Sequence, residues 1–581
     1  MRVLGVWDGH DSGAVLLVDG RIVAAVNEER LSRRKLEIRF PSASIAACLE
    51  IGCLRPEDID VVATCASDVA KTLARLLPST KEAYYQVRRR KAPSGFQSTF
   101  KKRCKYWITE CGPNPISRAL SHAWLRRVLD RTGFRRAALR VFDHHLCHAA
   151  TAAAGSNFRR CVVLTIDGVG DGLSATVGVF DAGRLTLLDR TPARHSPGIF
   201  FEHVTSLLNM RELEDEGKVM ALASYAALPQ PNALAPLLQP RGLRFRTAVP
   251  GHALYGRLKH LQWYYSNEQF ARMAQDALEQ ACVAVVREAV RRTGMTRVAL
   301  AGGVASNIQV NRLIRLLDDV DDVFVFPHMG DGGLALGAAL MATTEIGGPL
   351  AVDLGALDFG PGFDADDIQR MLDATGATYA RPANLARAVA DLLLQDQVVL
   401  WFQGRMEYGP RALGHRSILA RPDKSSLRDR LNLVLKRRVW YQPFCPSILH
   451  GDARRVFSDW KGSPDRYMTM GYTVREAYRP DLAAVVSVDG TCRPQIVDDD
   501  CSSEFAALLR AMKQRLGLGA LLNTSLNIHG EPLVCTPEQA LDVFHRSGAD
   551  ALALGPFLLL APHAATTAAR WADGVMAGVM A

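Results

Sequence analysis

The stretch Asp143-His144-His145-Leu146-Cys147-His148-Ala149-Ala150 is followed by Val162-Val163-Leu164-Thr165-Ile166 and then by Asp167-Gly168-Val169-Gly170-Asp171-Gly172. On a helix, His144 and His148 stand four residues apart, so both imidazoles project from one face and can reach one cation. The apolar run predicts a buried strand that ends on the carboxylate of Asp167. Two nitrogen ligands and a nearby carboxylate are the inventory of a catalytic metal site. The alternative interpretation is a histidine pair that only packs in the core.

Strands flank polar glycine turns at two places in the chain. Residues 2–7 and 14–18 surround the turn 8–13, which contains Asp8 and His10, and residues 162–166 and 175–180 surround the turn with Gly168. Such turns suit anionic oxygens because their amides are free and their side chains are short. Taken alone, the first copy is no more than a hairpin. Two copies predict the duplicated actin-like architecture.

Two further strand ends carry polar groups. The apolar run 298–301 leads into Gly302-Gly303, where a nucleotide can approach the backbone at a helix N-terminus. Asn307 and Asn311, one turn apart, suit a ribose or a carbamoyl group. Asp331 follows the run 324–327, and we expect it to complete the metal site of His144 and His148.

A second α/β unit is predicted from a helix at 385–394 and a strand at 398–402. The strand enters the segment 403–419, in which Arg405, Arg411 and Arg416 are interspersed with glycine and proline. Guanidinium groups match phosphate oxygens, so this segment predicts an anion site. We place the first domain at 1–350, a linker at 351–380 and the second domain at 381–581.

Composition indicates a globular protein, with 48% hydrophobic and 22% charged residues. The net charge of +10 is concentrated in residues 81–105, which hold nine Lys or Arg against one acid, interleaved with aromatic residues. That mixture is a nucleic-acid signal, although a solvated helical hairpin or mobile flap is the simpler interpretation. Twelve cysteines without a C-x-x-C pair favour a reduced protein. We expect a cytoplasmic location, no signal peptide and no membrane insertion.

Six motifs resemble the NodU/CmcH family of O-carbamoyltransferases: His10-Asp11 with Ala14, Glu28-Glu29-Arg30, His144-His145 with His148-Ala149, Gly302-Gly303-Val304, Gly409-Pro410-Arg411-Ala412-Leu413-Gly414, and Asn523-Thr524-Ser525. The resemblance covers nearly the whole chain in matching order. It implies an actin/Hsp70/kinase-like (Kae-like) N-terminal domain and a YrdC-like α/β C-terminal domain. It also implies that ATP and carbamoyl phosphate give carbamoyl-adenylate in the second domain. A hydroxyl of an antibiotic-type natural product then takes the carbamoyl group in the first domain.

The resemblance also implies residue roles. His144, His148, Asp167 and Asp331 would hold the metal, which is iron in the family. His10 suits a general base, with Lys35 beside it. The remaining binding residues fall into two sets. In the first domain these are Asp8, Gly168, Lys218, Gly302, Gly303, Asn307 and Asn311. In the second domain they are Arg405, Arg411, Arg416, Lys436, Arg493, Asn523 and His529. ATP would enter with Mg²⁺.

Two departures and two rival classes stay open. Residues 438–444 lack an acid and an arginine of the family pattern, and His529 stands where a family member has arginine, so one contact to carbamoyl phosphate is either lost or made by a neighbouring residue. The basic and aromatic insert at 81–107 lies outside the family pattern, and we expect it to recognise the acceptor. A tRNA threonylcarbamoylation-type enzyme is the main alternative. A hydrogenase-type maturation factor is disfavoured because the chain has no C-x-x-C pair.

Overall fold

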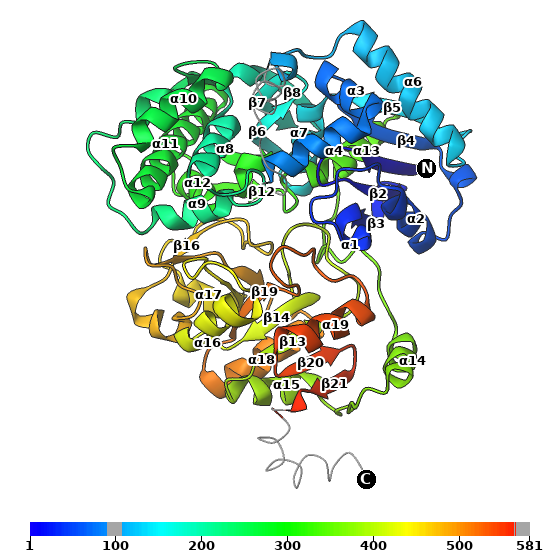
Figure 1. Ribbon diagram of the computed structural model, residues 1–581, viewed down its shortest axis with the longest axis vertical. Helices are drawn as coiled ribbons and strands as arrows, with labels where there is room; N and C mark the ends of the chain where they lie inside the picture. The colour runs from blue at the N-terminus through cyan, green and yellow to red at the C-terminus, as the bar shows by residue number, and fades with distance from the viewer. Residues whose placement is uncertain (90–106, 563, 565–581) are drawn as a thin grey trace. The chain divides into compact units, whose positions relative to one another are not determined.

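A computed structural model describes residues 1–89, 107–562 and 564 (Figure 1). The described chain forms two compact units. The first contains residues 1–28, 36–354 and 461–463, and the second contains residues 29–35, 355–460 and the described residues from 464 onward. Two short segments therefore belong to a different unit from the residues on either side of them in sequence: residues 29–35 to the second unit and residues 461–463 to the first.

The first unit contains two five-stranded sheets with the same topology. One has the order β3-β2-β1-β4-β5, from Arg21–Asn27, Gly13–Val18, Arg2–Trp7, Val61–Cys65 and Ala138–Phe142. The other has the order β8-β7-β6-β11-β12, from Arg184–Pro192, Leu173–Asp181, Arg160–Gly170, Arg297–Ala301 and Asp322–Val325. In each sheet the first three strands along the chain pair antiparallel with their neighbours. The fourth strand pairs parallel with the first, and the fifth pairs parallel with the fourth. This repeat confirms the duplicated actin/Hsp70/kinase-like architecture.

Two helices of small residues form the centre of this unit. α7 (His144–Gly155) packs on β6 and β11, and α13 (Leu334–Glu345) packs on α7, β1 and β4. Glycine permits the close approach, because a Cβ on Gly337 would lie 2.2 Å from the carbonyl oxygen of Cys147. A Cβ on Gly5 would lie 1.9 Å from the carbonyl oxygen of Ala335. The tight packing fixes the start of α7, where His144 and His148 lie.

The remaining elements of the first unit surround this centre. Their bounds are α1 (Glu28–Ser32, shared with the second unit), α2 (Ser42–Ile51), α3 (Val69–Leu76), α4 (Pro78–Arg88), α6 (Pro115–Arg131), α8 (Pro197–Leu207), α9 (Glu216–Ala223), β9 (Leu238–Arg241), β10 (Arg244–Thr247), α10 (Gly251–Gln262), α11 (Asn267–Thr293) and α12 (Ile308–Arg315). The 27-residue α11 begins with a Ser266–Gln269 capping box and ends at left-handed Gly294, two strong helix boundaries.

The second unit is built on a seven-stranded mixed sheet, order β18-β15-β19-β14-β13-β20-β21. Its strands are Gln495–Val497, Cys445–Leu449, Ala520–Ser525, Arg416–Ala420, Val399–Phe402, Ala551–Leu554 and Phe557–Leu560. The sheet packs against α15 (Leu385–Leu394) and α18 (Glu504–Leu516) around buried Trp401. α14 (Ala365–Thr375), α16 (Ser425–Arg430), α17 (His450–Val456), α19 (Pro537–Ser547) and the pair β16 (Tyr472–Thr473) and β17 (Thr491–Cys492) complete it. The predicted helix at 385–394 is confirmed, and the predicted strand begins one residue later than expected.

The fold class is therefore α/β, a duplicated actin-like unit followed by a separate α/β unit, as predicted. Within the described residues, no helix has both the length and the hydropathy that crossing a membrane requires.

Candidate active site

The four predicted metal ligands converge in the first unit. Ligand atoms of His144, His148, Asp167 and Asp331 all lie within 4.8 Å of one another. His144 Nε2 is 3.1 Å from Asp167 Oδ2, and His148 Nε2 is 3.6 Å from Asp331 Oδ1. Nε2 of His148 is buried and has no hydrogen-bond partner among the described residues. Two imidazole nitrogens and two carboxylates, one nitrogen lacking a partner, fit a divalent transition metal.

The electrostatics of this cluster also favour a cation. Burial opposes protonation of His144, yet the carboxylates of Asp331 and Asp167 raise its pKa to about 9. His145, which points elsewhere, behaves differently: burial and the neighbouring histidines lower its pKa to about 3. Its Nδ1 pairs with Thr165 Oγ1 at 2.7 Å, which makes it a core residue.

A carboxylate to which the sequence assigned no role holds the start of α7. The carboxylate of Asp171 accepts hydrogen bonds from the backbone amides of His144, Ser67 and Asp68, at 2.8, 3.0 and 3.1 Å. Burial, together with Asp68, raises the pKa of Asp171 to about 6. Gly170 lies against the His144 ring so closely that a Cβ there would come within 2.2 Å of it. These contacts fix where the imidazole points.

The glycine pair Gly302-Gly303 serves the same cluster. The amide of Gly303 donates to Asp167 Oδ1 at 2.9 Å, which leaves Oδ2 directed at the histidines. Gly302 has φ +94°, and a Cβ on it would lie 2.3 Å from the carbonyl oxygen of Ile166. The turn thus requires glycine for its conformation and for its contact with β6.

His10 lies at the edge of the cluster. Its Nδ1 is 3.6 Å from Asp331 Oδ2 and has no hydrogen-bond partner within the described parts of the chain. Trp7 Nε1 donates to the carbonyl of His10 at 2.8 Å and so holds the turn. Burial lowers the pKa of His10. A neutral imidazole with an available nitrogen beside the metal-type cluster suits a proton acceptor.

Asp8 is surrounded by cations. Arg75 binds both of its carboxylate oxygens, at 2.8 and 3.0 Å, and Lys71 Nζ lies 2.8 Å from Oδ1. Although burial raises the pKa of Asp8, Arg75 and Lys71 hold it far below its usual range. Asp8 therefore organises charge around the first turn, and its predicted binding role stays a prediction.

Gly168 and Lys218 lie near a second charged cluster. A Cβ on Gly168 would lie 3.2 Å from Glu202 Oε1, and Ser196 Oγ donates to the Gly168 carbonyl at 2.6 Å. Lys218 pairs with Asp215 at 2.8 Å. Burial, with the charge of Glu202, raises the pKa of Glu216 to about 8.

Asn307 and Asn311 serve the helix that carries them. Asn307 Oδ1 accepts from the Val310 amide and from Gln275, at 3.2 and 3.0 Å, and its Nδ2 donates to Gln275 at 2.8 Å. Asn311 Nδ2 donates to the Ala305 carbonyl at 2.7 Å. In this structure both amides stabilise the turn before α12.

In the second unit, two of the predicted arginines hold the backbone of the glycine-rich segment. Arg416 is fully buried, stacks 3.5 Å above Phe402 and donates to backbone carbonyls including those of Gln403 and Gly404. Arg405 donates to the carbonyls of Phe359 and Gly360. Both arginines therefore donate hydrogen bonds to main-chain carbonyls.

Arg411 belongs instead to a cluster that only partly appeared in the sequence. Arg493 donates to Cys445 Sγ from Nε and Nη2, at 3.2 and 3.0 Å. Burial and the charge of Arg493 lower the pKa of Arg411 to about 9, and burial lowers that of Arg438 to about 9. Arg411 Nε is buried without a hydrogen-bond partner among the described residues. Three guanidinium groups lie around one thiol, an arrangement whose charge suits an anion.

Asn523 faces the same cluster, because β19 pairs Asn523 with Cys445 of β15. Its Nδ2 donates to Ser447 Oγ at 2.9 Å and to the carbonyl of Ala412, the neighbour of Arg411, at 3.1 Å. Its Oδ1, by contrast, is buried without a partner in the described structure. This orphaned oxygen, in the same cluster as the orphaned Arg411 Nε, is what an absent polar ligand would leave behind.

Lys436, Lys35 and His529 lie elsewhere in the second unit. Lys436 donates to Ser525 and Asn527, and burial lowers its pKa strongly, with further lowering by Arg438 and Lys35. Lys35 therefore belongs with Lys436, in the segment 29–35 of the second unit, whereas His10 belongs to the first. His529 is exposed.

The start of the basic insert differs from the solvated or mobile element that we expected. Arg88 Nε pairs with Glu212 at 2.8 Å and Arg88 Nη2 pairs with Glu202, and both groups are buried. Arg89 donates to the Leu36 carbonyl at 2.8 Å. Three acids across the fold, Glu202, Glu212 and Glu214, account for this burial. Arg88 and Arg89 are thus not available to RNA. Residues 90–106 lie outside the described residues.

Sequence reasoning missed several site residues. Asp171 was quoted within its turn without a role, and Cys445 was not singled out; Arg438 was read only as one more cation of the second unit. The signal for Asp171 was local, since a non-glycine residue at φ 53° in a tight turn marks a special position. Cys445 carried no such signal, because strand pairing is what places it beside Asn523.

Two family models match the chain. "Carbamoyltransferase N-terminus" matches residues 2–340, and "Carbamoyltransferase C-terminus" matches residues 390–560. Nodulation protein NolNO of Sinorhizobium fredii is 33% identical over 95% of this chain and 79% of its own length. Nodulation protein NolO of Bradyrhizobium diazoefficiens is 36% identical over 72% of this chain and 78% of its own length. The 3'-hydroxymethylcephem-O-carbamoyltransferase of Streptomyces clavuligerus is 31% identical over 55% of this chain and 60% of its own length. As its motifs predicted, the chain belongs to the carbamoyltransferase family, in the group of the nodulation proteins and the cephem O-carbamoyltransferase.

Proposed function

We propose that this carbamoyltransferase uses ATP and carbamoyl phosphate to make carbamoyl-adenylate, and carbamoylates a hydroxyl group of a small natural product. The observation that carries the proposal is the arginine cluster around Cys445, with its orphaned Arg411 Nε and Asn523 Oδ1. The cluster offers carbamoyl phosphate positive charge for its phosphate group. It also offers one hydrogen-bond donor, Arg411 Nε, and one acceptor, Asn523 Oδ1. The name of the cephem O-carbamoyltransferase supports the choice of a hydroxyl acceptor.

Donor activation belongs to the second unit. Water cleaves carbamoyl phosphate to carbamate and orthophosphate, and the carbamate oxygen attacks the α-phosphorus of ATP and displaces pyrophosphate. Arg411, Arg438 and Arg493 bind the phosphate oxygens, and Asn523 Oδ1 accepts from the carbamoyl amide. Lys436 and Lys35 bind the triphosphate, which enters as its Mg²⁺ complex. The loop is preorganised because Arg405 and Arg416 fix its carbonyls.

Carbamoyl transfer belongs to the first unit. The acceptor hydroxyl loses its proton to the His10 imidazole, its oxygen bonds to the carbamoyl carbon, and AMP leaves with the electrons of the broken C–O bond. The turn of Trp7 and His10 sets the position of the base, and Asp331 orients it. Enclosing the mixed anhydride limits its loss to water.

A divalent metal would be held by the four residues His144, His148, Asp167 and Asp331. We propose Fe(II), since paired histidines and carboxylates are an iron-type donor set. When bound, the metal supplies Lewis-acid polarisation of the carbonyl and charge for the phosphate. The residues supply its position: Gly303 directs Asp167, and Asp171 and Gly170 direct His144.

Separating the half-reactions tests the proposal. Arg411→Ala should abolish pyrophosphate release from ATP and carbamoyl phosphate, and with it all product. His10→Asn should still release pyrophosphate but lower product formation by about 10²–10⁴-fold. Mass spectrometry of the product and a pyrophosphate assay measure both. If His10→Asn stops pyrophosphate release while it still uses supplied carbamoyl-adenylate, the two sites are assigned the wrong way round.

A further inference from the structure

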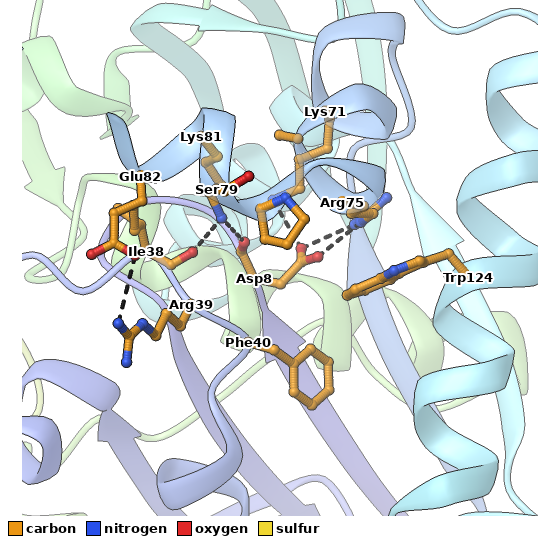
Figure 2. Close-up of a pocket in the computed structure, with 12 residues that line it drawn as sticks. Asp8, Ile38, Arg39, Phe40, Lys71, Arg75, Ser79, Lys81, Glu82 and Trp124 are labelled. Carbon is orange, nitrogen blue, oxygen red and sulfur yellow. Dashed lines mark hydrogen bonds and ion pairs between the residues drawn. The ribbon is translucent and has the colours of Figure 1, made fainter. Parts of the chain in front are cut away.

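A cavity of about 380 Å³ opens beside Asp8, between α3, α4, α6 and the segment 38–40 of the first unit. Figure 2 shows Asp8 at its centre, with Arg75 and Lys71 on one side and Lys81 above it. The charged lining consists of four cations, Arg39, Lys71, Arg75 and Lys81, and two acids, Asp8 and Glu82. The cavity therefore carries an excess of positive charge.

The pairing of these groups locates the excess. Arg75 and Lys71 share the single carboxylate of Asp8. Arg39 faces Glu82 at 3.5 Å. Lys81 donates to the backbone carbonyls of Asp8 and Ile38 rather than to a carboxylate. A half-buried lysine whose hydrogen-bond partners among the described residues are backbone carbonyls is a favourable position for an incoming anion.

The opposite wall of the cavity is aromatic. Phe40 and Trp124 meet edge to face, with ring centroids 6.2 Å apart and an interplanar angle of 71°. Figure 2 shows Phe40 below Asp8 and Trp124 to its right, both on the side away from Lys81. A flat ring placed between them and the cations would gain both stacking and cation–π contacts.

The cavity is distinct from the metal-type cluster, because the indole of Trp7 separates them. Lys71 Nζ lies 3.9 Å from the centroid of the Trp7 ring, and the His144 ring lies against Trp7 at 5.9 Å. Trp7 also donates to the His10 carbonyl. Trp7 thus lies between Lys71 of the cavity and His144 of the cluster, and Asp8, which lines the cavity, stands two residues before His10.

We propose that this cavity binds a small organic anion with a flat ring, whose carboxylate, sulfonate or phosphate lies against Lys81 and Arg39 and whose ring lies against Trp124 and Phe40. The anion takes over Lys81 from the carbonyl of Asp8, two residues before His10. Occupancy therefore adjusts the turn that carries the proposed base. The ligand is recognised by charge and planarity together, so neither an inorganic anion nor a neutral ring satisfies the cavity alone.

Isothermal titration of the full chain with benzenesulfonate tests this, since the probe keeps one negative charge across the useful pH range. It should bind about tenfold or more tightly than sulfate or benzyl alcohol. Lys81→Gln and Trp124→Leu should each weaken it about tenfold. Arg135→Gln, at an exposed arginine outside the cavity, is the matched control and should bind as the wild type does.

The pH dependence gives a second readout. Burial, with the charges of Lys71 and Arg75, lowers the pKa of Lys81 to about 7, and Asp8 and Glu37 oppose this. The other charged groups at the cavity are Arg39 and Glu82. Benzenesulfonate should therefore bind more weakly as the pH rises through about 7, and Lys81→Gln should remove that dependence.

Wild-type affinity in both cavity variants, or no binding up to about 10 mM, overturns the proposal. Thermal melting accompanies each titration. If Lys81→Gln fails to fold, Arg39→Gln replaces it, because the Arg39 side chain is 62% exposed and its loss leaves the core intact.

Discussion

Replacing Gly170 by alanine should remove the metal without removing the fold. A Cβ at this position would lie 2.2 Å from Cγ and Cδ2 of His144 and 2.6 Å from Nδ1. Carbon atoms pack at about 3.5–4.0 Å, so the ring must retreat by about 1 Å. Metal–ligand distances tolerate only about 0.2 Å. His144 Nε2 would therefore leave the group of donor atoms, and metal affinity should fall by at least about 10–100-fold.

Metal content after equilibrium dialysis against Fe(II) under anaerobic conditions measures this, with Co²⁺ as an air-stable substitute. Gly256→Ala is the matched control, because a Cβ there meets no atom within 4 Å and alanine favours the helix. Overpacking should cost the Gly170 variant about 1–3 kcal/mol of stability. Pyrophosphate release should persist, since the arginine cluster lies in the other unit. A folded Gly170→Ala protein with wild-type metal affinity would refute the placement of His144 among the ligands.

Three further predictions concern the first unit. His148→Ala should fold but lose bound metal and carbamoyl transfer; full metal content in the purified variant would contradict the ligand assignment. Arg88→Met should destabilise the protein by about 3 kcal/mol in urea unfolding, because it leaves Glu202 and Glu212 buried without their cation; an effect confined to the acceptor KM would instead favour the acceptor-binding role predicted from the sequence. Glu216 has its pKa raised from 4.5 to about 8, so the folded state keeps a proton that the unfolded chain loses, and stability should fall as the pH rises through that window. Glu216→Gln should remove a slope of about 1 kcal/mol per pH unit, and equal slopes in both proteins would show that Glu216 is ionised.

Much of the first unit could be predicted because its information is local. The i, i+4 spacing of His144 and His148 and the carboxylates at strand ends are properties of short segments. Parallel strands meet at one edge of a sheet, so the pattern of apolar runs alone predicts that Asp167 and Asp331 lie together. The strand–turn–strand repeat likewise implied two sheets of one topology. The two sheets, in which β1 and β6 are the equivalent central strands, have that common topology.

The second unit was less predictable, because its arginines have two uses that a sequence cannot separate. Arg405, Arg411 and Arg416 share one glycine-rich segment, yet two of them bind carbonyls and one faces Arg493. What distinguishes them is the strand on which each partner lies. Arg416 is the first residue of β14, and its side chain stacks on Phe402 of the adjacent β13, whereas Arg411 precedes the strand and lies near Cys445, the first residue of β15.

The same reasoning explains Arg88, whose charge was read as a surface property. A run of arginines is usually solvated, because burying a charge is costly unless it is paired. Here Glu202 and Glu212, more than 110 residues away, supply the pairing, and no local pattern contains them. α4 contacts both halves of the duplicated fold. In the first half, Tyr85 lies beside His10 and Lys81 donates to the Asp8 carbonyl. In the second half, Arg88 pairs with Glu202, which lies next to Gly168. The helix that opens the basic insert is therefore part of the wall of the site, so sequence changes in it should alter catalytic geometry as well as acceptor choice.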